Sequence, residues 1–110
     1  MQLEAGGPIK KAAISESTAA SNEIVAAVAG KALRVIGFAL TAASAVNVTL
    51  EDEDGANDMT GAMQLTASNL HLVLPEAGCG WGDTVSGKGI HLLSSGAVAV
   101  AGVIIYQEIG

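Results

Sequence analysis

The densest group of possible metal ligands lies in residues 50–61, which read LEDEDGANDMTG and carry five of the eleven acidic residues. A complete calcium-binding loop ends with a bidentate Glu about twelve residues after its first ligand. The twelfth residue counted from Asp52 is Met63, so that closing ligand is missing. Three interpretations stay open: a solvated turn, a docking surface for a partner, and a calcium site. The oxygen-bearing residues around Gly55 are Asp52, Asp54, Asn57 and Asp58.

A second candidate is GDTVSGKG, residues 82–89, which matches the G-x-x-x-x-G-K pattern of phosphate-binding loops. Gly89 stands where a Ser or Thr would bind magnesium. The loop also needs a helix directly after it, whereas the following IHLLSS is typical of a strand. We therefore expect no nucleotide here, and the sequence indicates no other cofactor.

Residues suited to nucleophilic or zinc chemistry are present but scattered. The chain has no G-x-S-x-G motif, and His71 and His91 fall within predicted strands. Neither histidine is close in sequence to Cys79, the single cysteine, so no zinc site is expected. The sequence therefore predicts a protein that is not an enzyme. Trp81 lies in a glycine-rich loop, where it either closes one end of the fold or anchors a partner.

Composition limits the partners. The 110 residues suit one domain, and a net charge of −6 with only five Lys and Arg argues against nucleic acid as a ligand. Residues 24–46 are long enough to span a membrane. However, Lys31 and Arg34 lie near the middle of this segment, and each would cost roughly 2.5–3.5 kcal/mol in a bilayer. We expect two strands and a turn there, and no membrane partner.

The apolar pattern has a period of two. In AVNVTLE, residues 45–51, Val46, Val48 and Leu50 point one way while Asn47 and Thr49 point the other. Clusters of Gly, Ser, Asn and Asp separate similar runs, which predicts an all-β sandwich or barrel of about eight short strands. The expected strands are 9–16, 23–29, 31–41, 45–51, 62–67, 70–74, 88–94 and 97–107.

Two of these strands carry large apolar side chains on both faces. The outer face of a sheet in a sandwich normally meets solvent, so a second apolar face predicts contact with a neighbouring subunit. The alternative is that small alanines are simply exposed. The residues expected at the interface are Val103 and Ile105, opposite Val100 and Ile104, and Ile36 and Phe38, opposite Leu33 and Val35.

Several turns and strand ends together suggest a family. They are the V-x-G-K turn in IVAAVAGKALRVIGF, the MTGAM segment, the LP…GW loop and the closing V-x-G-x-x-x-Y strand. Over roughly residues 9–108 the chain resembles the jelly-roll head decoration, or capsid cement, proteins of tailed bacteriophages. It departs from them in its acidic loop, where those sequences usually have a shorter and less charged hairpin, so the role of that loop stays open.

The resemblance implies a jelly-roll β-sandwich over 9–110, preceded by a flexible N-terminal arm at 1–8. It also implies a homotrimer that binds the major capsid protein on the outer surface of the head, after assembly in the host cytoplasm. The alternative is a small binding module of a phage tail or cell surface, with a carbohydrate or protein ligand. The residues expected to contact the capsid are Gly6, Gly7, Pro8, Lys10, Asp52, Asp54 and Trp81.

Overall fold

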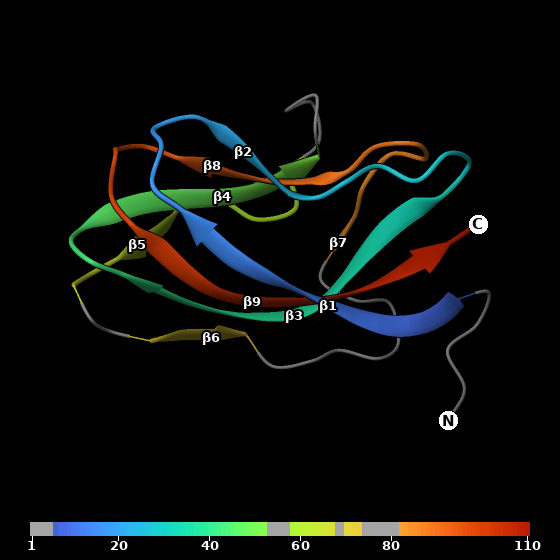
Figure 1. Cartoon of the computed structure of the whole chain (residues 1–110), viewed down its shortest axis with the longest axis horizontal. Helices are drawn as coiled ribbons and strands as arrows, with labels where there is room; N and C mark the ends of the chain where they lie inside the picture. The colour runs from blue at the N-terminus through green and yellow to red at the C-terminus, as the bar shows by residue number, and fades with distance from the viewer. Residues whose placement is uncertain (1–5, 53–57, 68–69, 74–81) are drawn as a thin grey trace.

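The computed structural model describes residues 6–52, 58–67, 70–73 and 82–110. Within these ranges the chain forms nine β-strands and no helix (Figure 1). Runs rich in Val, Ile and Leu form the strands, because such side chains pack well on a pleated surface. The strands are β1 (Gly6–Glu16), β2 (Ser21–Val25), β3 (Ala32–Ala42), β4 (Val46–Asp52), β5 (Met63–Leu65), β6 (His71–Val73), β7 (Gly82–Asp83), β8 (Ile90–Ser94) and β9 (Val100–Ile109).

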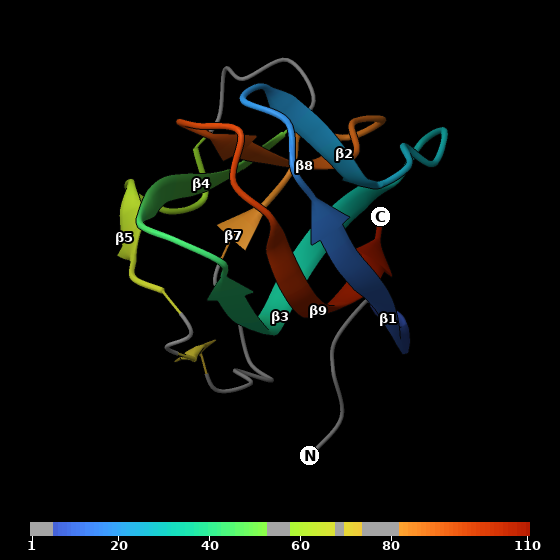
Figure 2. The same ribbon diagram turned by 60° about the vertical axis from the view of Figure 1, so that its left-hand side comes forward.

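The strands are arranged in two antiparallel sheets that pack face to face (Figure 2). The first sheet has the order β1-β9-β3-β6, with the short β7 also paired to β3, and the second has the order β2-β8-β4-β5. The pairs are nested along the chain: β1 with β9, β2 with β8, β3 with β6, and β4 with β5. A chain doubled back on itself and rolled into two sheets in this order is a jelly roll. The predicted fold class is therefore confirmed.

The core lies between the two sheets and is built almost entirely from aliphatic side chains. Burying each of them stabilises the fold by about 1.5–3 kcal/mol. Phe38 is the only aromatic residue of the buried cluster in the described part of the chain, which keeps the sandwich thin, with a shortest extent of 20 Å. The core residues with no exposed surface are Leu33, Val35, Leu40 and Ile104 from the first sheet and Val48, Leu50, Ile90 and Leu92 from the second.

The N-terminal strand is longer than the sequence indicates. Strand β1 begins at Gly6, which pairs with Ile109, so Gly6, Gly7 and Pro8 belong to the sheet and not to an arm. Strand β9 is long enough to pair with β1 as far as Gly6. The proline in β1 is tolerated because β1 is an edge strand. Residues 1–5 of the predicted arm lie outside the described residues.

A β-bulge in β3 overturns one prediction. The pairing of β3 with β9 shifts register between Val35 and Gly37, so one extra residue enters β3 at this point. The extra residue changes the phase of the strand and turns Phe38 into the core, where it is 3% exposed. Ile36 is also buried, at 2%. The expectation that Ile36 and Phe38 lie at a subunit interface is therefore wrong, because neither side chain reaches the surface.

Gly102 allows β9 to lie close to β3. Its φ is +156°, and a Cβ at this position would lie 1.9 Å from the carbonyl oxygen of Ala39. Only glycine fits such an approach without moving the backbone. This glycine is the third residue of the V-x-G-x-x-x-Y segment, so that motif has a structural cause.

Candidate functional site

The middle of the outer face of the first sheet is apolar, although Ser15, Thr41 and Gln107 also point to this side. Directly paired residues of antiparallel strands point to the same side of the sheet. Because Ile104 and its partner Phe38 point into the core, their neighbours Val103 and Ile105 point outward, where each is half-buried. We name this outer surface the apolar face; its residues are Ala13, Gly37, Ala39, Ala101, Val103 and Ile105.

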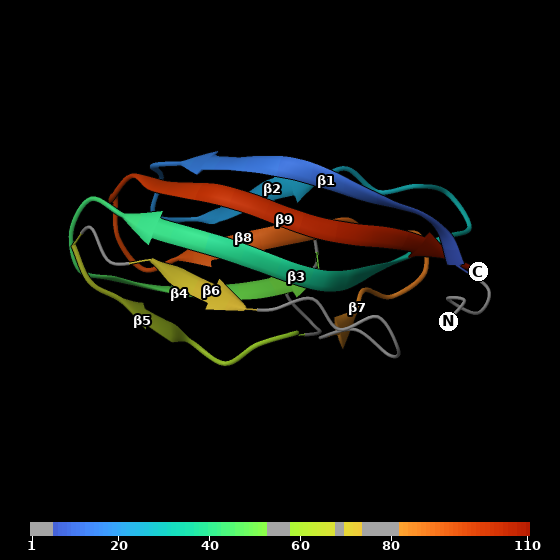
Figure 3. The same ribbon diagram turned by 90° about the horizontal axis from the view of Figure 1, so that it is seen from below.

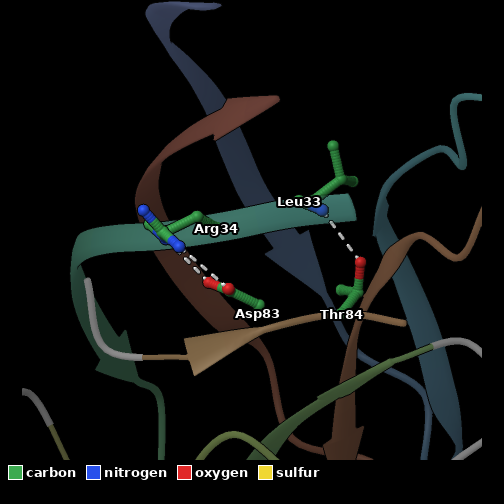
Figure 4. A network of polar contacts seen from close by, with 4 residues as sticks. All are labelled: Leu33, Arg34, Asp83 and Thr84. Atoms are coloured by element: carbon green, nitrogen blue, oxygen red, sulfur yellow. Dashed lines mark hydrogen bonds and ion pairs between the residues drawn. The ribbon is translucent and has the colours of Figure 1, made fainter. Parts of the chain in front are cut away.

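The apolar face has almost no free charge. Among the described residues that point to this side, the charged ones are Lys11, Arg34 and Asp83. Arg34 and Asp83 neutralise each other through two hydrogen bonds, from Nε to Oδ1 at 2.9 Å and from Nη2 to Oδ2 at 3.1 Å (Figure 4). Lys11 at the edge is therefore the main net charge, in a chain whose total is −6.

The outer face of the second sheet has the opposite character. We name it the polar face. The pairing of β8 with β2 and β4 places His91 between two acidic residues, Glu23 and Glu51. The other outward residues are mostly hydrogen-bonding side chains, and Leu93, at 40% exposure, is the one large apolar side chain among them. The residues of the polar face are Ser21, Glu23, Asn47, Thr49, Glu51, Gln64, His91 and Leu93.

Three residues of the polar face form a hydrogen-bonded group. Ser21 Oγ donates to Glu51 Oε2 at 2.6 Å and lies 3.0 Å from His91 Nδ1. A hydroxyl has one proton to donate. Because Ser21 gives that proton to the carboxylate, His91 Nδ1 is the donor in the second bond.

This arrangement is not that of a serine activated by histidine. An activating histidine accepts the serine proton, and a carboxylate orients the histidine from the other side. Here Ser21 is hydrogen-bonded to both Glu51 and His91, and the ring nitrogen nearest to Ser21 already carries a hydrogen. The group therefore joins β2, β4 and β8 and fixes the tautomer of His91.

The sequence did not indicate this group, because His91 appeared there as an isolated strand residue. The spacing of polar residues in three strands could have indicated this group, but that spacing is informative only when the strand order is known. No group of three or more metal-binding side chains that could hold an ion occurs in the described ranges.

The acidic stretch is only partly accessible. Asp52 is 1% exposed, and its Oδ1 has no hydrogen-bond partner among the described residues. It pairs with Ile90 at the end of β4, which directs it to the core side of the second sheet. The expectation that Asp52 contacts a capsid is therefore wrong in this structure. Asp54 and Asn57 lie outside the described residues, and Asp58 is exposed.

The other predicted contact residues are placed as follows. Lys10 is exposed and forms an ion pair of 2.8 Å with Glu108, and the hydrogen bond to this carboxylate raises the pKa of Lys10. Pro8 is exposed on β1. Trp81 lies outside the described residues, so both of its proposed roles stay untested.

Residues 82–89 form a turn that is held against β3. Thr84 Oγ1 accepts a hydrogen bond from the backbone N–H of Leu33 at 2.9 Å (Figure 4) and donates one to the carbonyl of Lys88 at 2.9 Å. The backbone N–H of Gly87 bonds to Lys31 O at 2.7 Å. Strand β8 follows, as predicted, so the segment lacks the helix that a phosphate-binding loop requires.

Comparison with known proteins found no matching family model, curated protein or solved structure. The likeness to phage decoration proteins therefore rests on the sequence motifs. Within the described ranges, no helix is long and apolar enough to cross a membrane.

Proposed function

We propose that this protein is a non-enzymatic structural component of a phage virion, which binds the outer surface of the head and decorates or cements it. Its partner is the major capsid protein, and its own oligomer is a trimer. The virion, the capsid partner and the trimer number come from the resemblance of residues 9–108 to head decoration proteins. The jelly roll is consistent with this role, since viral capsid proteins are among those that use the fold.

The observation that carries the proposal is the contrast between the two outer faces. A single subunit in solution would leave Val103 and Ile105 partly exposed on a face with little free charge. The polar face, in contrast, carries the exposed Glu23 and the half-buried His91, although Glu51 on the same side is buried. A structural subunit needs this asymmetry, because one side must bind its neighbours while the other stays soluble.

The proposal is tested by adding purified protein to heads that lack the decoration. The protein should bind to saturation and raise the temperature at which the heads release their DNA. A ligand that binds only the assembled shell stabilises it by mass action, by about 2.7 kcal/mol per site at a concentration one hundred times its dissociation constant. Glu23→Gln on the polar face is a matched control that should bind like the wild type.

Failure of the wild-type protein to bind heads would refute the proposal. Binding without a change in release temperature would support decoration of the head but contradict a cementing role. Binding of a carbohydrate array with no binding to heads would favour the alternative of a small binding module.

A further inference from the structure

Among the strands that the structure describes, β1 is the one long free edge. It has eleven residues and pairs only with β9 among the described strands (Figure 3). The other edge strands are much shorter, with five residues in β2 and three each in β5 and β6. Shortness is a common way in which proteins prevent edge-to-edge pairing. Strand β1 lacks that protection.

The first part of β1 is protected in other ways, and Lys10 and Lys11 add charge to the edge. Pro8 removes a backbone donor, and an irregularity interrupts the pairing with β9 between Gly6 and Ile9. From Lys10 to Glu16 the strand pairs regularly with β9, one residue opposite the next. Its outer edge there presents unpaired backbone N–H and C=O groups to any extended segment of suitable register.

We infer that β1 binds the β1 of a second copy of this chain, antiparallel and about a two-fold axis at Ala13. With a two-fold axis at Ala13, each residue lies opposite the residue of the other copy that is equally far from Ala13 on its other side. This register places Lys10 opposite Glu16 of the other copy, and Glu16 opposite its Lys10. The two ion pairs follow from one operation, because an isologous interface repeats each contact.

The faces of the two sheets also agree in this register. Lys10 and Glu16 pair with Tyr106 and Val100, so both point to the core side of the sheet, whereas Ala13 points outward. Residues that point to the same side of the sheet therefore lie opposite each other, and the first sheets of the two copies form one continuous sheet. Glu16 forms no ion pair among the described residues, and Lys10 has its present one with Glu108 at the surface.

Neighbouring registers lack this complementarity. An axis at Lys11 would place Lys11 opposite itself, which repels. An axis at Ala12 would place Glu16 opposite Pro8, and an axis at Ile14 would place it opposite Ala12. Only the axis at Ala13 brings opposite charges together at both ends.

This contact is separate from the apolar face and does not depend on the proposed function. A contact through the apolar face stacks another surface on top of the sheet, whereas a contact through β1 extends the sheet in its own plane. In the proposed trimer, the β1 contact would join one trimer to the next.

Cysteine cross-linking tests the register. In a Cys79→Ser background, Ala13→Cys places two thiols opposite each other, about 4.5–5.5 Å apart between Cα atoms, which a disulfide can bridge. Mild oxidation should convert most of the protein to a covalent dimer. Ser15→Cys is the matched control, since its two copies would lie about 13 Å apart along the strands and should not cross-link. Equal cross-linking of both variants, or of neither, would overturn the inference.

A charge exchange tests the ion pairs in solution. With Glu108→Gln throughout, to remove the internal partner of Lys10, both Lys10→Glu and Glu16→Lys should weaken dimerisation about tenfold, measured by sedimentation. An equimolar mixture of the two variants should restore it, because each pair then joins opposite charges. A mixture that associates no better than the separate variants would contradict the antiparallel pairing.

Discussion

Replacement of Ile105 by Glu tests whether this residue of β9 belongs to the core of the subunit or to an interface between subunits. Ile105 is half-buried on the apolar face and lies opposite Lys11 on one side and Gly37 on the other. In an isolated subunit, a Glu here faces solvent and can pair with Lys11, a cross-strand contact of about 0.2–1 kcal/mol. We therefore expect the fold to lose no more than about 1 kcal/mol of stability.

The same replacement has a large effect on an oligomer that uses the apolar face. Each subunit loses part of the about 1.5–3 kcal/mol that full isoleucine burial contributes, because Ile105 is already half-buried, and a carboxylate must also be desolvated. Association should weaken by at least a hundredfold, since 1.4 kcal/mol corresponds to a factor of ten. Light scattering at micromolar concentration should show an oligomer for the wild type and a lower mass for Ile105→Glu.

The neighbouring residue provides the control. Ile104 has no exposed surface, so Ile104→Ala should destabilise the fold by about 2–5 kcal/mol in urea denaturation followed by circular dichroism. A wild-type mass equal to that of a monomer would refute the subunit interface. If Ile105→Glu destabilises the fold as much as Ile104→Ala does, then Ile105 belongs to a core and the assignment of the faces is wrong.

Two further outcomes follow from individual contacts. Gly102→Ala should cost about 1–3 kcal/mol of stability because its Cβ would meet the carbonyl of Ala39, whereas Gly96→Ala, with no atom closer than 4.0 Å, should be nearly neutral in the same urea titration. Glu108→Gln should lower the pKa of Lys10 towards its ordinary value of 10.5, as followed by NMR titration. The sign is that of a raised pKa: the ion pair stabilises the fold below the unfolded-state pKa, and this stabilisation is lost as pH rises through the folded-state pKa.

The strands could be predicted from the sequence because their signals are local. Alternation with a period of two and turns rich in Gly, Ser and Asp are contained within each segment. The bulge in β3 shows the limit of that method. From the sequence, Phe38 lies on the face opposite Val35, but one extra residue at Ile36 places both in the core. Nothing in the alternation reveals where a register shift will occur.

The strand order has no local signal either. Strand β1 pairs with β9 across most of the length of the chain, and Ser21 meets Glu51 at a separation of 30 residues and His91 at a separation of 70. Periodicity says which side of a strand is apolar but not which strand lies beside it. The sequence therefore predicted Val103 and Ile105 as outward residues, which needed one strand only. It missed the Ser21 group, which needed three.

The apolar face and the β1 edge lie on the same sheet but point in different directions. A contact through the face stacks another surface on top of the sheet, and a contact through the edge extends the sheet in its own plane. Two such contacts in perpendicular directions allow copies to associate both through their faces and through their edges. A subunit with only the face contact would form only the oligomer that uses the apolar face, and one with only the edge contact would form only pairs joined through β1. Ile105→Glu and the exchange of Lys10 and Glu16 remove the two contacts one at a time, so association through the face and association through the edge can be measured independently.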